Sequence, residues 1–309
     1  MENTACILRI EKISPNDGHG LRTVVFFKGC PLRCAWCSTP ESQRLQPELC
    51  YKAARCVHCG RCVQACPQGA LTLDKHHRLH FDRKSCTDCG RCADICPQDA
   101  LSFYGKAMTL DAVMKEIRKD EIFYHHSGGG VTLSGGDVLL QADFAAALLK
   151  ACQDNAIHTM AELDMYGDFS RIAQLLPHLD ALYADLKLMN PTAHKRWTGV
   201  DNTSILDNIR RAAEQHPALH IRVPLIPGVN DDAENLLATL DFCQSLAACA
   251  ELEFLPYHRL GTATYAALFR DFALAELSAM SRETALQKLA VLADQKADFP
   301  IRLSGEQIY

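Results

Sequence analysis

Short apolar runs alternate with amphipathic segments along most of the chain. The apolar runs lie at 23–28, 131–133, 157–163, 181–188, 219–226 and 251–257. Their length and their content of β-branched and aromatic residues are typical of buried strands. Segments with helical periodicity lie near 109–119, 141–154, 168–178, 203–216 and 231–247, and the tail (275–309) predicts one more long helix and a short strand at 299–303.

This alternation predicts βαβ units and a parallel sheet flanked by helices. Six strands are too few for a closed eight-stranded barrel. The expected fold class is therefore α/β, an open TIM-like partial (β/α)6 barrel formed by residues 1–46 and 105–309.

Residues 47–104 interrupt this pattern and contain an internal repeat. The stretch Cys56–Leu71 recurs thirty residues later as Cys86–Leu101, and each copy has the spacing C-x2-C-x2-C-x3-C-P. This run is found in bacterial two-cluster ferredoxins, in which the fourth cysteine binds the other [4Fe–4S] cluster. Paired zinc ribbons, the alternative, would not explain the proline after each last cysteine. The expected ferredoxin-like insert thus has two ligand sets, Cys56, Cys59, Cys62 and Cys96 for one cluster and Cys86, Cys89, Cys92 and Cys66 for the other.

A further group of cysteines, Cys30, Cys34 and Cys37, follows the first predicted strand in one tight loop. A [4Fe–4S] cluster normally takes four cysteines, so three cysteines would leave one iron open to another ligand. A zinc site is the alternative, but it needs a fourth Cys or His, and the segment 28–38 has none. We therefore expect a third cluster at this loop, with one iron open for chemistry.

Composition and charge narrow the class of protein. The chain has 309 residues, 16 cysteines, a formal net charge of −5 and a pI near 6.2, which gives no electrostatic footprint for nucleic acid. No run approaches the ~20 apolar residues of a membrane span, and the first residues lack the form of a signal peptide. Most cysteines sit in close clusters, which favour metal or redox chemistry over disulfides. We expect a cytoplasmic protein of reducing, oxygen-poor conditions, with no nucleic-acid or membrane partner.

Polar residues recur at the C-terminal ends of the predicted strands, where barrels of this kind carry their sites. A glycine pair there lets a ligand approach the backbone closely, and a dry site for a charged ligand requires compensating charges of both signs. In chain order the candidates are the Cys30 loop, Gly135-Gly136-Asp137, Glu162, Asp185 with Lys187, Arg222 and His258.

Three stretches resemble one family of enzymes. The spacing C-x3-C-x-aromatic-C, with Trp36 before Cys37, is the signature of the radical S-adenosylmethionine (SAM) enzymes. The stretches Asp17–Arg22 (D-G-H-G-L-R, with histidine at the usual proline) and Leu255–Gly261 (L-P-Y-H-R-L-G) resemble segments of the activating enzymes of glycyl radical enzymes, of the pyruvate formate-lyase activating type. With the two-cluster insert, they indicate the subgroup that carries such an insert.

The resemblance also implies which residues bind the cofactors. In that family SAM chelates the open iron, and a monovalent cation lies near the SAM carboxylate. Asp137 stands where the family usually has glutamate, and Asp164 is an alternative to Glu162 as the inward-facing acid. Carried over to this chain, the SAM-binding residues are Trp36, Cys37, Ser38, Gly135, Gly136, Asp137, Glu162, Asp185, Lys187, Arg222 and His258, of which Lys187, Arg222 and His258 are expected to be catalytic.

The activity implied by the resemblance is that of a radical SAM activase. A flavodoxin or ferredoxin-type reductant feeds an electron through the insert clusters to the SAM-bound cluster. Reductive cleavage of SAM gives a 5′-deoxyadenosyl radical, which takes a hydrogen atom from a glycine Cα of a partner glycyl radical enzyme; the hard chemistry belongs to the cofactors. Two alternatives stay open from the sequence, a radical SAM enzyme acting on a small molecule or peptide and a three-cluster electron carrier.

Overall fold

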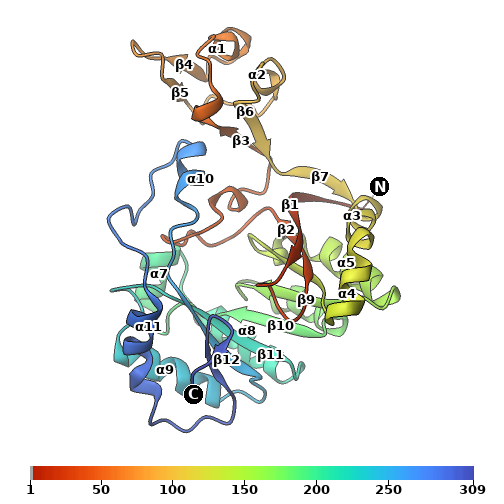
Figure 1. Ribbon diagram of the computed structural model, residues 1–309, viewed down its shortest axis with the longest axis vertical. Helices are drawn as coiled ribbons and strands as arrows, with labels where there is room; N and C mark the ends of the chain where they lie inside the picture. The colour runs from red at the N-terminus through yellow and green to blue at the C-terminus, as the bar shows by residue number, and fades with distance from the viewer. Residues whose placement is uncertain (1–2) are drawn as a thin grey trace.

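The computed structural model describes residues 3–309 and is built on a mixed sheet with a parallel centre. The six predicted strands are confirmed and lie side by side, all parallel, in the order in which they occur along the chain (Figure 1). They are β2 (Arg22–Phe27), β8 (Gly130–Gly135), β9 (His158–Leu163), β10 (Ala181–Asp185), β11 (Leu219–Leu225) and β12 (Glu251–Pro256).

Four further strands extend this sheet at its two edges to a total of ten. β1 (Thr4–Ser14) runs antiparallel to β2, and β7 (Lys106–Thr109) runs antiparallel to β1. At the other edge β13 (Ile301–Leu303) is parallel to β12, and β14 (Glu306–Gln307) is antiparallel to β13. The short strand predicted at 299–303 is therefore a seventh parallel strand.

The predicted helices between the strands are confirmed as α3 (Leu110–Ile117), α5 (Ala142–Asp154), α6 (Phe169–Ala173), α8 (Thr203–Ala213) and α9 (Ala233–Gln244). Thr109 caps α3, because its side chain accepts a hydrogen bond from the Ala112 amide. Three further helices were not predicted from the sequence, namely α4 (Glu121–Ser127), α7 (Pro191–Thr198) and α10 (Thr262–Ala267).

The long helix predicted in the tail is wrong. α11 (Arg282–Leu289) begins where the Ser281 side chain caps the Thr284 amide, and it ends in the short 3-10 turn Ala290–Leu292. The residues on either side of α11 are irregular, and Pro300 leads directly into β13. Helical periodicity in this region therefore extends beyond the helix that forms.

The two faces of the central sheet differ in polarity. Ala184, Ile221 and Leu252 are register neighbours on one face and are fully buried in the main core. The next residues along the same strands, Asp185, Arg222 and Glu253, form a polar row on the other face. Side chains alternate between the faces of a strand, so the same strands supply both the apolar core and a polar wall.

Residues 48–104 form a small lobe beside the main sheet, at the top of Figure 1. Its strands pair antiparallel, β3 (Glu48–Tyr51) with β6 (Leu101–Tyr104) and β4 (Leu71–Leu73) with β5 (Leu79–Phe81). The two copies of the repeat carry the matching helices α1 (Arg61–Ala65) and α2 (Arg91–Asp94), preceded by Gly60 and Gly90 at φ 72° and 82°. The lobe has its own small apolar core.

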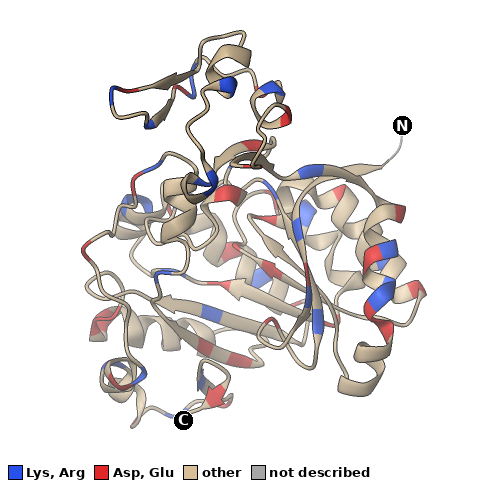
Figure 2. Ribbon diagram, turned by 45° about the horizontal axis from the view of Figure 1, so that its top comes forward, with Lys and Arg blue, Asp and Glu red and all other residues tan. Residues whose placement is uncertain are grey.

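Basic and acidic residues are interspersed along the helices and strands (Figure 2). Among residues 3–309, no helix combines the length and apolar character that crossing a membrane would need.

Candidate functional site

The cysteine loop follows β2 and is held on both sides by backbone hydrogen bonds. The Gly29 amide donates to the Ser42 carbonyl at 2.6 Å. On the other side, the amides of Arg33 and Ala35 donate to the carbonyls of Thr198 and Trp197 at 2.7 and 3.0 Å. The loop is thus fixed between the turn that follows it and the C-terminal end of α7.

The three cysteines of this loop lie in buried, charged surroundings. The Cys30 sulfur is 3.5 Å from an Asp164 carboxylate oxygen. Burial raises the pKa of the Cys34 thiol to about 12, although the Lys187 ammonium acts in the opposite direction. Such thiols need cationic compensation to serve as thiolate ligands, and Lys187 provides it.

Gly135 and Gly136 pack against the base of this loop. A Cβ on Gly135 would lie 2.5 Å from the backbone of Phe27, and a Cβ on Gly136 would lie 2.1 Å from the Gly29 carbonyl oxygen. The Gly136 and Asp137 amides donate to the carbonyls of Phe27 and Gly29. The close approach seen here is therefore between the glycine pair and the cysteine loop.

Two buried carboxylates, Asp137 and Asp164, lie next to each other beside the cysteines. Burial and the neighbouring Asp164 charge raise the pKa of Asp137, and burial raises the pKa of Asp164. One Asp137 oxygen accepts from the Leu139 amide at 3.0 Å, and the other has no hydrogen-bond partner among residues 3–309. A buried oxygen without a hydrogen-bond partner lowers the stability of the fold, so this pair of carboxylates is suited to a cationic ligand.

Lys187 and Asp185 form an ion pair of 2.8 Å at the end of β10. Burial lowers the pKa of Lys187, but Asp185, Cys34 and Asp164 outweigh that effect and raise it. Lys187 therefore remains a cation in a group of anionic side chains.

Arg222 and Glu162 belong to a second ionic group on the polar wall of the sheet. The Arg222 guanidinium donates to Glu162 and, at 2.9 Å, to Glu253, and it lies 4.0 Å above the Tyr183 ring. Ser134 donates to the other Glu162 oxygen at 2.6 Å. The structure thus places Glu162 with Arg222, and Asp164 with the cysteine loop.

Of the other predicted cofactor-binding residues, Trp36 and Ser38 belong to the loop or follow it directly, and His258 lies three residues before Gly261, which contacts that loop. Trp36 is buried in the main core, whereas Ser38 and His258 are exposed. Burial of part of the ring lowers the pKa of His258. Gly261, from the same motif as His258, packs so closely that a Cβ there would lie 2.7 Å from the Ser38 carbonyl oxygen.

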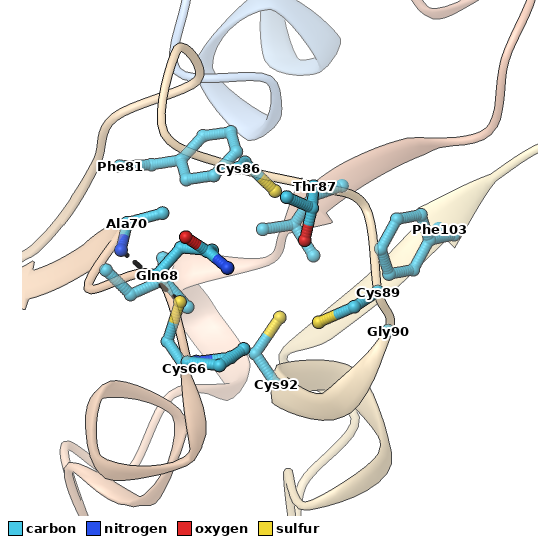
Figure 3. Close-up of a pocket in the computed structure, with 13 residues that line it drawn as sticks. Cys66, Gln68, Ala70, Phe81, Cys86, Thr87, Cys89, Gly90, Cys92 and Phe103 are labelled. Carbon is cyan, nitrogen blue, oxygen red and sulfur yellow. Dashed lines mark hydrogen bonds between the residues drawn. The ribbon is translucent and has the colours of Figure 1, made fainter.

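The insert brings its eight cysteines together around two pockets. One pocket is lined by the first set below, and Figure 3 shows these sulfur atoms directed toward one another. The other pocket is lined by the second set. We name the sets the Cys86 site (Cys66, Cys86, Cys89 and Cys92) and the Cys56 site (Cys56, Cys59, Cys62 and Cys96).

Within residues 3–309, no three His, Cys, Asp or Glu side chains converge closely enough to bind a single metal ion. A [4Fe–4S] cluster makes a different demand, because each cysteine binds a different iron. Four sulfurs around an open pocket fit that demand.

The sequence analysis did not identify three residues of the ionic group around Arg222, namely Glu253, Ser134 and Tyr183. The alternation in Glu251-Leu-Glu-Phe254 was a usable signal, because it places two acids on the face opposite the apolar core. Contacts between distant segments, such as Arg222 with Glu162, leave no such signal in one strand.

The chain is similar to known proteins in the insert and over nearly its whole length. Residues 55–100 match the 4Fe-4S dicluster domain family. The chain is 42% identical to the (2S)-3-sulfopropanediol sulfolyase activating enzyme of Bilophila wadsworthia, over 93% of this chain and 95% of that protein. It is 39% identical to the indoleacetate decarboxylase activating enzyme of Tractidigestivibacter scatoligenes, over 87% and 88%.

The fold also has a solved counterpart. The crystal structure of a radical SAM methyltransferase from Sphaerobacter thermophilus matches 98% of this chain and 78% of that one, with a TM-score of 0.55 at 11% identity. This likeness concerns the fold alone. Sequence identity of about 40% over nearly the whole chain, in contrast, shows the family as well as the fold. The chain therefore belongs to the activating enzymes of glycyl radical enzymes.

Proposed function

We propose that this chain activates a partner glycyl radical enzyme by forming a radical on the Cα of one glycine of that partner. The observation that carries the proposal is the three-cysteine loop, which lies against the buried Asp137–Asp164 pair and Lys187 in a chain of this family. When bound, a [4Fe–4S] cluster and SAM supply the chemistry, a one-electron cleavage of SAM to methionine and a 5′-deoxyadenosyl radical that abstracts the hydrogen atom.

The residues of the chain hold these groups and balance their charge. Cys30, Cys34 and Cys37 would bind three irons, and Lys187 would offset the negative charge that the thiolates and carboxylates concentrate there. The orphaned Asp137 oxygen beside Asp164 suits a cationic partner, either the SAM amino group or a monovalent cation near the SAM carboxylate.

We expect the remaining predicted contacts to face the same loop. Asp185, Arg222 and His258 follow or belong to three adjacent strands of the parallel sheet. We assign Arg222 and His258, with Lys187, to the contacts with SAM and the glycine segment. Trp36, Ser38 and the glycine pair would shape the SAM pocket.

The domain arrangement that fits this role is a partial (β/α)6 barrel (1–46 and 105–309) with a ferredoxin-like insert (47–104). The polar wall of the sheet would line the barrel interior, and the apolar face would pack against the helices. Because the expected ligands are free thiols and thiolates, we place the protein in the reducing cytoplasm.

The insert would supply a path for electrons from a flavodoxin or ferredoxin-type donor, and strand pairing suggests its direction. β3 leaves the barrel at residue 48 and β6 returns to it at 104. Leu49 pairs with Phe103, and both line the Cys86 site. Tyr51 and Leu101, one step farther out, pair at the Cys56 site. The Cys56 site is therefore the outer one, where a donor would deliver its electron.

Anaerobic turnover tests the proposal. Cluster-loaded protein with SAM and dithionite should form 5′-deoxyadenosine, and addition of the partner should give a glycyl radical detectable by electron paramagnetic resonance (EPR). C34A should abolish both signals, whereas C152A, at a buried cysteine of α5, should retain them. Formation of 5′-deoxyadenosine without a glycyl radical on any sulfonate lyase, dehydratase or decarboxylase of the glycyl radical class would contradict the assignment.

A further inference from the structure

One segment, residues 261–270, touches both the cysteine loop and the insert. It contains α10 and the turn that follows it, and it comes directly after the motif that holds His258. In Figure 1, α10 lies beneath the insert and above the end of the main sheet. We call residues 261–270 the bridge segment.

Its first half lies against the cysteine loop. A Cβ on Gly261 would lie 2.7 Å from the Ser38 carbonyl oxygen and 3.0 Å from that of Cys37. Tyr265 is buried four residues later, and its pKa is raised first by burial and then by the nearby Cys37 and Cys34 thiols. These contacts therefore fix this end of the segment against the three-cysteine loop.

At its other end, the Phe269 ring packs against two aromatic rings of the insert. The Phe269 ring stacks on Tyr51, with centroids 5.4 Å apart and planes 8° apart, and lies 5.3 Å from Phe81. Tyr51 lines the Cys56 site and Phe81 lines the Cys86 site. Phe269 has φ 55°, in a region that residues other than glycine rarely adopt. The contacts on its ring must therefore hold an unfavourable backbone conformation.

Arg270 adds a buried ionic contact beside this ring. Its guanidinium donates to Glu48 of β3 at 2.6 Å and to the Pro40 carbonyl at 3.0 Å. The Glu48 side chain is fully buried and also lies 3.2 Å from Arg83 of the insert. One arginine thus joins the turn after the cysteine loop, the first strand of the insert and the bridge segment.

We propose that the bridge segment positions the insert relative to the cysteine loop, through Phe269 and Arg270, and so sets the separation of the insert sites from the SAM site. This inference rests on the proposed role of the insert as an electron path. The insert joins the barrel through the adjacent strands β3 and β6, which run side by side. Two neighbouring crossings act as a hinge. Glu48 and Tyr51 belong to one of these strands, whereas Phe81 of β5 lies outside both, so the contact of Phe269 with Phe81 fixes the hinge angle.

The test compares F269A and R270Q with the wild-type chain, with R270K as the conservative variant. F123A is the matched control, because Phe123 is a partly exposed aromatic residue on α4, outside the insert contacts. Three quantities are measured. They are the rate of hydrogen exchange of the β3 peptide, the EPR spin–spin interaction between the reduced clusters of the insert and the reduced cluster at the cysteine loop, and the rate of partner activation. Activation is measured with a protein donor and with a small photoreductant that reaches every cluster.

F269A and R270Q should keep wild-type cluster content and wild-type SAM cleavage with the photoreductant. The β3 amides should exchange about tenfold faster, and the spin–spin interaction should weaken. Activation by the protein donor should be several-fold slower, because electron transfer slows steeply as the clusters move apart. R270K should restore part of the change, and F123A should show none.

Unchanged exchange and spin–spin interaction would overturn the positioning role, whatever the activation rate. An equal loss with both reductants would also overturn it, because general destabilisation affects both. Faster hydrogen exchange of β3 and a weaker spin–spin interaction, at an unchanged activation rate, would support the positioning role. The same result would refute the proposed electron path through the insert. Should F269A fail to bind its clusters, F269L and R270Q carry the same comparison.

Discussion

Lys187 is a buried cation among carboxyl and thiol groups, which are negatively charged once they lose their protons. It pairs with Asp185 at 2.8 Å, and its ammonium acts on Cys34 and Asp164. Replacing it by methionine would leave these charges without their cation in a site of low dielectric. We expect K187M to lower the rate of 5′-deoxyadenosine formation by about 100-fold.

The same substitution should cost about 1–3 kcal/mol of stability, a modest figure because Asp185 is one-third exposed. K187R retains the charge and should keep more of the activity than K187M. Equal rates for K187M and the wild-type chain, measured anaerobically by chromatography, would exclude Lys187 from the site.

Gly136 is a position where a side chain has no room. Its Cβ would lie 2.1 Å from the Gly29 carbonyl oxygen, and backbone cannot move as cheaply as the tip of a side chain. G136A should therefore lower stability by about 3 kcal/mol and displace the cysteine loop. The check is anaerobic thermal unfolding together with iron content.

Gly167 provides the contrast. It has φ +121°, and no atom lies within 4 Å of the position that a Cβ would take, so G167A introduces backbone strain alone. We expect a loss of about 1 kcal/mol with full iron content. A G167A protein that loses iron as G136A does would show that loss of iron does not require a clash with the cysteine loop.

At the scale of elements, β11, β12 and β13 are joined by an ionic contact on their polar face. The Glu251 carboxylate accepts from Arg302 at 2.8 Å and lies 3.1 Å from His220. Burial alone would raise the pKa of Glu251, but His220 and Arg302 together outweigh burial and lower it.

A carboxyl whose folded pKa is lowered stabilises the fold above its unfolded pKa of about 4.3, and this contribution is lost as the pH falls through the folded pKa. E251Q should therefore be less stable at pH 7 by about 1–3 kcal/mol and should lose less on acidification. Thermal unfolding at pH 7 and pH 4 measures both effects. Parallel pH profiles for E251Q and the wild-type chain would contradict the assignment.

The two cysteine runs of the insert exchange their last residues. Cys96 belongs to the second run but lines the Cys56 site, and Cys66 belongs to the first run but lines the Cys86 site. C96S should therefore remove the cluster bound by the first run and spare the other. Iron content and Mössbauer spectra of C96S and C66S check this. Loss of the same cluster in C96S and C86S would disprove the exchange.

The order of the central strands could be predicted from the sequence, because each strand is a continuous apolar run and parallel neighbours follow one another along the chain. The antiparallel edge strands could not. β7 has only four residues, Lys106–Thr109, and it is defined by pairing with β1, about a hundred positions earlier. The tail helix was overpredicted because helical periodicity continues beyond α11, where the chain forms the 3-10 turn Ala290–Leu292 and then an irregular segment.

Candidate residues could be found wherever a motif or a strand end marked them. The cysteine runs and the strand-end charges are local signals of that kind. The pairing of Asp164 with the cysteine loop and of Glu162 with Arg222 depends on how far each strand extends before it turns, which one-dimensional spacing does not determine. Phe269 and Arg270 carry no motif, and only the docked insert reveals their contacts.

At the scale of the whole molecule, the proposed electron path would run from the two cysteine sites of the insert to the cysteine loop of the barrel. The outer Cys56 site adjoins the Cys86 site, and the turn of the Cys86 site is tied toward the barrel by the ion pair of Asp88 with Arg44, at 2.7 Å. The cysteine loop lies beyond that contact, at the end of β2. A donor that docks at the outer end would then be kept apart from the partner enzyme.

This separation gives the last prediction. In a chain with C59S and C89S, the cysteine loop is intact, so a small photoreductant should still support SAM cleavage at a rate close to wild type. The proposed electron path from a flavodoxin or ferredoxin-type donor runs through the insert, so the glycyl radical yield with such a donor should fall steeply. EPR of the glycyl radical measures the yield. An undiminished yield with the protein donor would mean that electrons enter the barrel directly, and the insert would then need another role, such as docking of the partner.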